Sequence, residues 1–212
     1  NSAEFGGGMY NRYSGPTLTN CTFASNLADS GGNDDEDDRH GGGMYNDESD
    51  PTLTNCTFAS NSAFRGGGMY NRQILSNAFT IPTLIDCTFL NNSAENRGGG
   101  MFNDSCSPAL ADCTFTENSA EFDGGGMYND SSSPTLADCT FMGNSADLGG
   151  GMSNDFSSPI LTGCEFTGNS AVEHGGGMYN TNNSSPILTG CEFTGNSAEY
   201  GGGMYNNSSP IL

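Results

Sequence analysis

The sequence contains no lysine and no tryptophan, and it has few apolar residues. Hydrophobic residues make up 33% of its 212 positions, which is little for a compact two-layer domain of this length. No apolar run is long enough to cross a membrane, no window shows a helical period, and the amino end carries no basic-then-apolar signal segment. We therefore expect no membrane insertion within these residues and an architecture in which each unit buries only a thin slice of core.

Positive charge is also scarce. Five arginines face 25 aspartates and glutamates, for a formal net charge of −20. Nucleic acids and anionic membranes present phosphates that require Lys and Arg, so neither is expected as a partner. The balance suits an extracellular or cell-surface protein bathed in salt or divalent cations; simple solubility is the alternative explanation.

A short phrase recurs along the whole chain. Gly-Gly-Gly-Met begins at positions 6, 41, 66, 98, 124, 149, 175 and 201, in steps of 35, 25, 32, 26, 25, 26 and 26 residues. Such a period is the signature of a repeat array. Residues 1–212 are therefore one array, with insertions at 29–40 and 72–81 in the two longest steps.

Each repeat has the pattern of short strands and turns. In one regular unit, Asn118-Ser-Ala precedes Gly124-Gly-Gly-Met-Tyr-Asn, and Pro134-Thr-Leu-Ala-Asp-Cys-Thr-Phe follows. Alternating apolar residues interrupted by turn formers predict three short strands, at Gly-Gly-Met-Tyr-Asn, Thr-Leu and Cys-Thr-Phe. The predicted fold is all-β, a parallel β-helix of about eight coils of 25–26 residues with three short strands per coil.

In such a solenoid, equivalent residues stack at about 4.8 Å. Met, Leu, Cys, Phe and the Ala of Asn-Ser-Ala are expected to form interior columns. The glycines permit a tight corner and a close approach of the next strand. Asparagines at one turn should form a ladder of amide hydrogen bonds: Asn26, Asn61, Asn92, Asn118, Asn144, Asn169 and Asn196. The aromatic residue after each Met, replaced once by Ser153, is expected to face outward, where it and the acidic flank offer lateral contacts.

Seven of the eight cysteines occupy one repeat position, and only Cys106 stands outside it. They lack the close C-x-x-C pairs of a zinc site. Stacked parallel side chains rarely reach disulfide geometry, so a column of buried thiols is favoured over a column of disulfides.

The phrases Gly-Gly-Gly-Met-Tyr-Asn, Ser-Pro-Thr-Leu and Asp-Cys-Thr-Phe-x-x-Asn-Ser-Ala resemble the right-handed parallel β-helix repeats of large bacterial surface proteins. They are similar to the repeats of polymorphic outer-membrane proteins and autotransporter passengers, whose signatures are Gly-Gly-x-Ile and Phe-x-x-Asn. Here Met takes the place of Ile, and Phe141-Met-Gly-Asn144 matches the second signature. The resemblance covers the chain apart from the two insertions and implies a secreted or surface-displayed passenger used for adhesion or as a fibre.

An enzymatic role is not expected. Polysaccharide-active enzymes with this solenoid carry a groove of clustered carboxylates, often with Arg or Lys as base, whereas here the same residues recur coil after coil. An ice-binding face is also disfavoured, because the Thr-x-Thr pattern at Thr17 and Thr19 becomes irregular in later coils.

Calcium is the one cofactor that the residues suggest. Carboxylates recur at one turn (Asp86, Asp112 and Asp138), at a second position (Asp104, Asp130 and Asp155), and in an acidic run within the first insertion (Asp34, Asp35, Glu36, Asp37 and Asp38). Stacked carboxylates should raise one another's pKa unless a cation screens them, and oxygen-rich sites suit Ca²⁺. The alternative for the acidic run is a solvated charge cluster.

The sequence therefore predicts a structural, extracellular β-helical rod that forms or extends a surface fibre. Both ends fall in mid-repeat without an evident cap, so we expect either a longer array or end-to-end self-association of copies. The alternative function is an adhesin that binds glycans or host surfaces through the insertions at 29–40 and 72–81.

Overall fold

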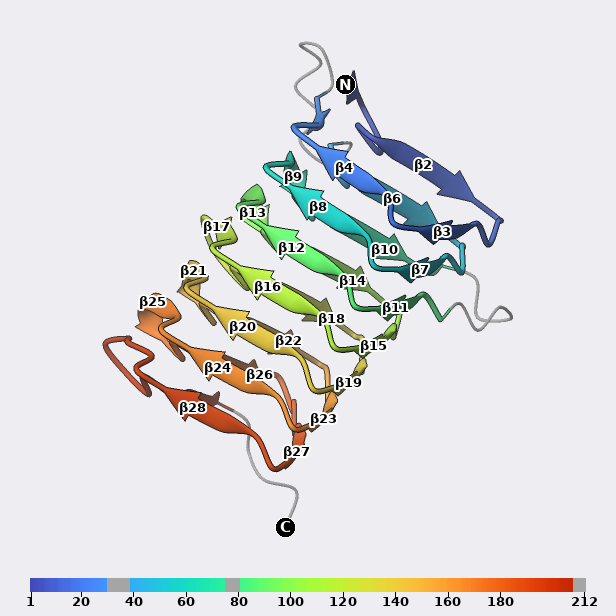
Figure 1. Ribbon diagram of the computed structural model, residues 1–212. Helices are drawn as coiled ribbons and strands as arrows, with labels where there is room; N and C mark the ends of the chain where they lie inside the picture. The colour runs from blue at the N-terminus through green and yellow to red at the C-terminus, as the bar shows by residue number, and fades with distance from the viewer. Residues whose placement is uncertain (30–38, 75–80, 208–212) are drawn as a thin grey trace.

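The chain winds into a stack of flat coils, from the blue amino end to the red carboxyl end of Figure 1. The computed structural model describes residues 1–29, 39–74 and 81–207. Every regular element in these ranges is a β-strand, and every strand pairs in parallel with its equivalents in the neighbouring coils. The described residues therefore contain no helix that could cross a membrane. The predicted all-β parallel solenoid is confirmed.

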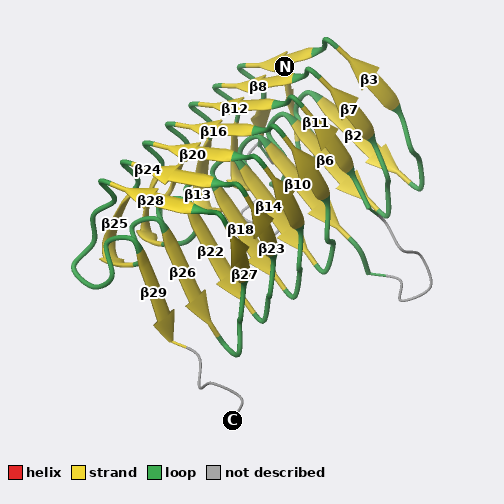
Figure 2. Ribbon diagram, turned by 60° about the horizontal axis from the view of Figure 1, so that its bottom comes forward, coloured by secondary structure: helices red, strands yellow, loops and turns green. Residues whose placement is uncertain are grey.

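The strands stack into four sheets, which Figure 2 shows as parallel rows along the solenoid. Sheet A contains β1 (Ser2–Ala3), β5 (Leu27–Ala28), β9 (Ser62–Arg65), β13 (Ser93–Arg97), β17 (Ser119–Ala120), β21 (Ser145–Leu148) and β25 (Ser170–His174). Sheet B contains β2 (Met9–Arg12), β6 (Met44–Asp47), β10 (Met69–Arg72), β14 (Met101–Asp104), β18 (Met127–Asp130), β22 (Met152–Asp155), β26 (Met178–Thr181) and β29 (Met204–Asn207).

Sheet C contains β3 (Thr17–Thr19), β7 (Thr52–Thr54), β11 (Thr83–Ile85), β15 (Ala109–Ala111), β19 (Thr135–Ala137), β23 (Ile160–Thr162) and β27 (Ile187–Thr189). Sheet D contains β4 (Thr22–Ala24), β8 (Thr57–Ala59), β12 (Thr88–Leu90), β16 (Thr114–Thr116), β20 (Thr140–Met142), β24 (Glu165–Thr167) and β28 (Glu192–Thr194). Sheets B, C and D are the three expected strands of the coil. Sheet A is a fourth that the sequence did not predict, because only its first two residues, Ser-Ala, recur in most coils, and the residues that follow vary in number and type.

The corners between strands are made by residues with positive φ. In one repeat these are Ser105 (φ 54°), Asp112 (53°), Glu117 (53°) and Gly124 (66°). The left-handed region is open to Gly and tolerated by Asn, Asp and small polar residues. This backbone requirement explains why Asn, Asp, Ser and Gly recur at most of these corners; Tyr13, Glu48, Glu117 and Phe156 adopt the same conformation without belonging to these residue types.

The triple glycine fills a crowded corner. A β-carbon on Gly99, in the middle of one triplet, would lie 2.2 Å from the carbonyl oxygen of Ser119 and 2.5 Å from that of Gly125. The corresponding contacts recur at Gly67 and Gly125. The expected close approach of the next strand is confirmed, and any side chain there would force coils apart.

The main core runs along the solenoid axis and is built from the inward residues of sheets B, C and D. It consists of four columns, of Met, Leu, Cys and Phe, as the pattern predicted. The Phe rings of successive coils are nearly parallel; Phe89 and Phe115, for example, have centroids 4.6 Å apart and planes 2° apart. The column of Ala residues is buried as expected, but Ala94, Ala120 and Ala146 form a small cluster separate from this core.

The column of aromatic residues after Met is not an exposed surface, contrary to expectation. Tyr45, Tyr70, Phe102 and Tyr128 are 2–4% exposed and form a second core. The chain turns at the first glycine of each triplet, which has a positive φ. The residue before that glycine therefore lies across the aromatic rings of sheet B. The ring centroid of Phe5 lies 5.3 Å from that of Tyr45, and the Arg97 guanidinium lies 5.1 Å from the Tyr128 ring. The buried rings are therefore not available for lateral contacts.

Two ladders of buried asparagines tie the coils together. In the predicted ladder, Asn118 donates its side-chain amide to Oδ1 of Asn144 (3.0 Å) and to the carbonyl oxygen of Phe89 (3.0 Å). Each member repeats this pattern toward the next coil. A second ladder, at the Asn two residues after each Met, was not predicted; there Asn103 donates to Asn129 across 2.8 Å. Both ladders satisfy polar groups that burial would otherwise leave unpaired.

Candidate functional site

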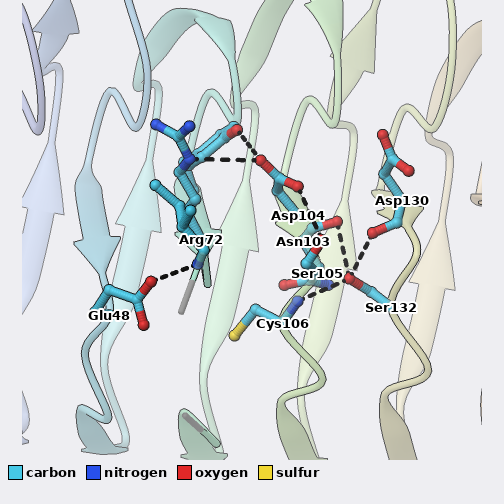
Figure 3. A network of polar contacts seen from close by, with 10 residues as sticks. Glu48, Arg72, Asn103, Asp104, Ser105, Cys106, Asp130 and Ser132 are labelled. Atoms are coloured by element: carbon cyan, nitrogen blue, oxygen red, sulfur yellow. Dashed lines mark hydrogen bonds and ion pairs between the residues drawn. The ribbon is translucent and has the colours of Figure 1, made fainter. Parts of the chain in front are cut away.

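A column of charged residues runs along the last position of sheet B. In register from coil to coil it reads Arg12, Asp47, Arg72, Asp104, Asp130 and Asp155. The first four alternate in sign, and Arg12 pairs with Asp47 (3.2 Å) as Arg72 pairs with Asp104 (3.7 Å). Figure 3 shows Arg72 reaching toward Asp104 while Asp130 stands one coil further on.

The last three charged residues of this column are aspartates, as the sequence predicted for Asp104, Asp130 and Asp155. Each carboxylate accepts a hydrogen bond from the protein: Asp104 from Ser105 (3.4 Å), Asp130 from Ser131 (3.2 Å) and Asp155 from Asn182 (2.6 Å). Burial, together with the charges of Asp104 and Asp155, raises the pKa of Asp130 above its usual range. The column therefore holds unbalanced negative charge at Asp130.

The second predicted carboxylate set lies at a different corner of the coil. Asp86, Asp112 and Asp138 occupy the turn between sheets C and D, with φ of 53°, 53° and 51°. Asn20 and Asn55 fill this turn in earlier coils, and Gly163 and Gly190 in later ones, all with positive φ. The left-handed backbone is thus a sufficient reason for these residue types.

No three-ligand metal site is present in the described residues. Among residues 1–29, 39–74 and 81–207, no group of three or more His, Cys, Asp or Glu side chains is arranged to hold a metal ion. The acidic run of Asp34, Asp35, Glu36, Asp37 and Asp38 lies outside the described ranges. The two aspartate columns are not brought together, so any Ca²⁺ would be held within a single column.

Polar side chains also enter the second core. The Arg97 guanidinium pairs with the buried Asp123 carboxylate at 2.7 Å, and burial raises the pKa of Asp123 despite that partner. His40 is 4% exposed, and neither ring nitrogen has a hydrogen-bond partner. Burial, with the charges of Arg65 and Arg72, lowers the pKa of His40 to about 3.

Cys106 takes the place of a serine in a third hydrogen-bonded column. In Figure 3 its backbone N–H donates to Oγ of Ser132 (3.0 Å), and Ser132 continues the column toward Ser157 with an N–H···Oγ bond of 2.9 Å. Ser132 Oγ in turn donates to the carbonyl oxygen of Asp130 (2.8 Å). The odd cysteine is thus a substitution within a structural column.

The other seven cysteines form what we term the thiol column: Cys21, Cys56, Cys87, Cys113, Cys139, Cys164 and Cys191. All seven are free thiols, as expected, and the five inner ones are buried. Their Sγ atoms donate to backbone carbonyls of their own or the preceding coil; Cys113, for example, donates to Ala111 at 3.3 Å and to Leu84 at 3.6 Å. Burial raises the pKa of Cys56. The column runs along the main core, and Asp86, Asp112 and Asp138 directly precede three of its cysteines at the turn between sheets C and D.

The unpredicted elements of this region are the serine column and the second asparagine ladder. The asparagine ladder left a clear signal, because an Asn follows every Met by two residues. The sequence signal for the serine column is weaker, because Cys106 and the second insertion interrupt the recurrence of serine.

Comparison with known families identifies the architecture. The family model described as a right handed beta helix region matches residues 1–122 and 74–212, which together span the chain. No curated protein matches the chain, and no solved structure matches it.

Proposed function

We propose that this chain, which belongs to the right-handed β-helix family, is a section of a rigid extracellular rod whose strand edges accept further coils. The main supporting observation is the continuous register of sheets B, C and D, whose parallel pairing runs from coil to coil despite the insertions at 29–40 and 72–81, while sheet A contains two register shifts. Such a structure resists bending because each coil is hydrogen-bonded along four sheets to its neighbours. The bacterial surface location follows from the resemblance to surface-protein repeats and from the net charge of −20.

The first coil presents a surface suited to another coil. The N–H groups of Thr57, Thr88 and Thr114 each donate to the cysteine carbonyl of the preceding coil. The equivalent N–H of Thr22 therefore points toward the open edge, beside the half-buried Leu18 and Phe23. An edge with aligned donors and partly covered apolar residues is a template for strand addition. The added coil has the same geometry whether it belongs to a longer chain or to a second copy.

Electron microscopy with layer-line analysis tests the rod. We expect filaments one solenoid wide with a repeat near 4.8 Å, the spacing of paired strands. Thr22→Pro removes the outward N–H, which an edge strand tolerates, and should leave discrete short rods, while Thr22→Val should still form filaments. Short rods from the unaltered chain, or equal assembly of both variants, would contradict end-to-end pairing.

A non-enzymatic role is part of this proposal. In the described coils the same carboxylates recur along columns, as at Asp104, Asp130 and Asp155, instead of converging on one point. Catalysis requires converging groups.

The second candidate function is an adhesin that binds glycans or host surfaces through the insertions. Ile74 and Ile81 flank the central part of the second insertion and are 61% and 51% exposed. Exposed apolar side chains at the base of an insertion are consistent with a contact surface. Deletion within both insertions, of residues 30–38 and 75–80, would abolish surface attachment by an adhesin and leave a plain rod unaffected.

A further inference from the structure

The thiol column is a line of soft ligands enclosed in an apolar core. Each cysteine backbone is one strand apart from the next, because N–H groups bond to the cysteine carbonyl of the preceding coil at 2.8–2.9 Å, as at Thr114 and Cys87. Four successive cysteines of the column are fully buried in the main core: Cys87, Cys113, Cys139 and Cys164. The proposed rod gives these thiols no function.

The spacing of the column suits a particular metal geometry. Paired strands lie about 4.7–4.9 Å apart, so an ion midway between two neighbouring sulfurs would lie about 2.4 Å from each, which is close to the roughly 2.3 Å of a zinc–thiolate bond. A metal ion between two neighbouring sulfurs would therefore be two-coordinate and linear. A third thiol lies a further strand away along the same line, which agrees with the absence of a three-ligand group in the described residues.

We propose that the thiol column binds soft monovalent d¹⁰ metal ions, of which Cu⁺ is the biological example, each held between the sulfurs of two adjacent coils. Thiolate and thioether ligands select Cu⁺ over harder ions.

The charge balance of the site fits its apolar surroundings. One thiol loses its proton to solvent and forms a thiolate–metal bond, and the neighbouring thiol binds through a sulfur lone pair. The unit of thiolate, thiol and monovalent ion is neutral, so no net charge is buried. No electron is transferred, because the ion enters as Cu⁺.

Linear pairing sets a stoichiometry that depends on which thiol is removed. Seven thiols in a row contain at most three non-overlapping neighbouring pairs. Removing the fourth, Cys113, leaves two runs of three thiols, which hold one ion each. Removing the fifth, Cys139, leaves runs of four and two thiols, which still hold three ions in total. Both side chains are fully buried, so the two variants are matched in environment.

The test is anaerobic titration of the full 212-residue chain with Cu⁺ supplied as its acetonitrile complex, followed by elemental analysis after gel filtration. We expect three ions per chain in the unaltered protein and in Cys139→Ala, but two in Cys113→Ala. Cys106→Ser, at a position where other coils carry serine, should retain three. Equal stoichiometry in Cys113→Ala and Cys139→Ala, or a loss in Cys106→Ser, would overturn the proposal.

X-ray absorption spectroscopy of the loaded protein requires no substitution, so its result does not depend on whether a variant folds. Two sulfur neighbours and no further ligand are expected around each ion. Three sulfurs, or oxygen and nitrogen neighbours, would refute linear pairing. Circular dichroism before loading checks that each variant is folded.

Discussion

The imidazole of His40 lies flat on the ring of Tyr70 in the next coil, with centroids 4.4 Å apart and planes 4° apart. This contact places an ionisable ring inside an aromatic core, where its nitrogens have no hydrogen-bond partner. Arg65 and Arg72 are the charged groups that oppose its protonation. The second core is therefore sensitive to acid at this point.

His40→Phe should remove that sensitivity. The pKa of His40 is lowered to about 3 in the folded chain, so between about pH 6.5 and pH 3 the unfolded chain binds a proton that the folded chain does not. The free energy of unfolding of the unaltered protein therefore decreases as the pH falls through this window. Phe5 occupies the equivalent position one coil earlier, so a phenyl ring fits there. The difference in melting temperature between the variant and the unaltered protein, measured from pH 7 to pH 4, should widen toward pH 4; a constant difference would contradict this assignment.

Asp130→Asn should stabilise the protein at neutral pH. The pKa of Asp130 is raised in the folded state, so its ionised form costs stability above that pKa and the cost disappears as the pH falls below it. Like charges facing across strands cost roughly 0.2–1 kcal/mol per pair. We expect the melting temperature to rise by about 1–4 °C at pH 7 and to be unchanged at pH 3. Ser131→Ala, which removes the hydrogen bond to this carboxylate, should act in the opposite direction at pH 7.

Calcium binding to the aspartate columns remains a proposal with a direct test. Ca²⁺ is expected to stabilise the unaltered chain by relieving repulsion among Asp104, Asp130 and Asp155, and EDTA to reverse the effect. Asp130→Asn should reduce the calcium-dependent shift in melting temperature. Identical melting curves in calcium and in EDTA would reject a calcium site anywhere in the chain, the acidic run at 34–38 included.

Asn118→Ala should destabilise the coil stack by about 2–4 kcal/mol. The substitution removes the side-chain donor to the carbonyl oxygen of Phe89, and it removes the acceptor of both the backbone N–H and the side-chain amide of Asn92, all in a buried environment. Urea unfolding measures the effect. Asn206→Ala is the matched control, because Asn206 is exposed at the end of its ladder and accepts only from Asn180 in the described residues. A loss of comparable size in the control would mean that the buried ladder adds no special stability.

Gly99→Ala should cost about 3 kcal/mol or more, since its β-carbon would overlap backbone oxygens of the next coil. Gly168→Asn is the control: the position has φ +63°, a β-carbon added there would meet no atom within 4 Å, and Asn91 occupies the same corner at φ 53°. We expect a change within about 0.5 kcal/mol there. Thermal unfolding of the two variants separates crowding from backbone conformation.

The period of about 25 residues, the inward Met, Leu, Cys and Phe columns and the first asparagine ladder could all be read from the sequence. The reason is that stacking turns a sequence repeat directly into a spatial column: Asn118 meets Asn144 because each occupies the same place in its own coil. The recurrence of Asp104, Asp130 and Asp155 predicted their adjacency in the same way.

The path of the chain around one coil was decided only by tertiary structure. Alternation showed that Tyr128 faces away from Met127, but not that Arg97 and Asp123 from sheet A and its corner would cover it. The burial of this ring depends on the positive φ of Gly98 and Gly124, because this backbone conformation turns the chain back over the ring. The sequence by itself thus determined which residues stack along the solenoid axis, because translation by one repeat is encoded in the period. The folded chain determined which faces are buried across a coil, because corner angles are set by backbone conformations that residue type permits without specifying.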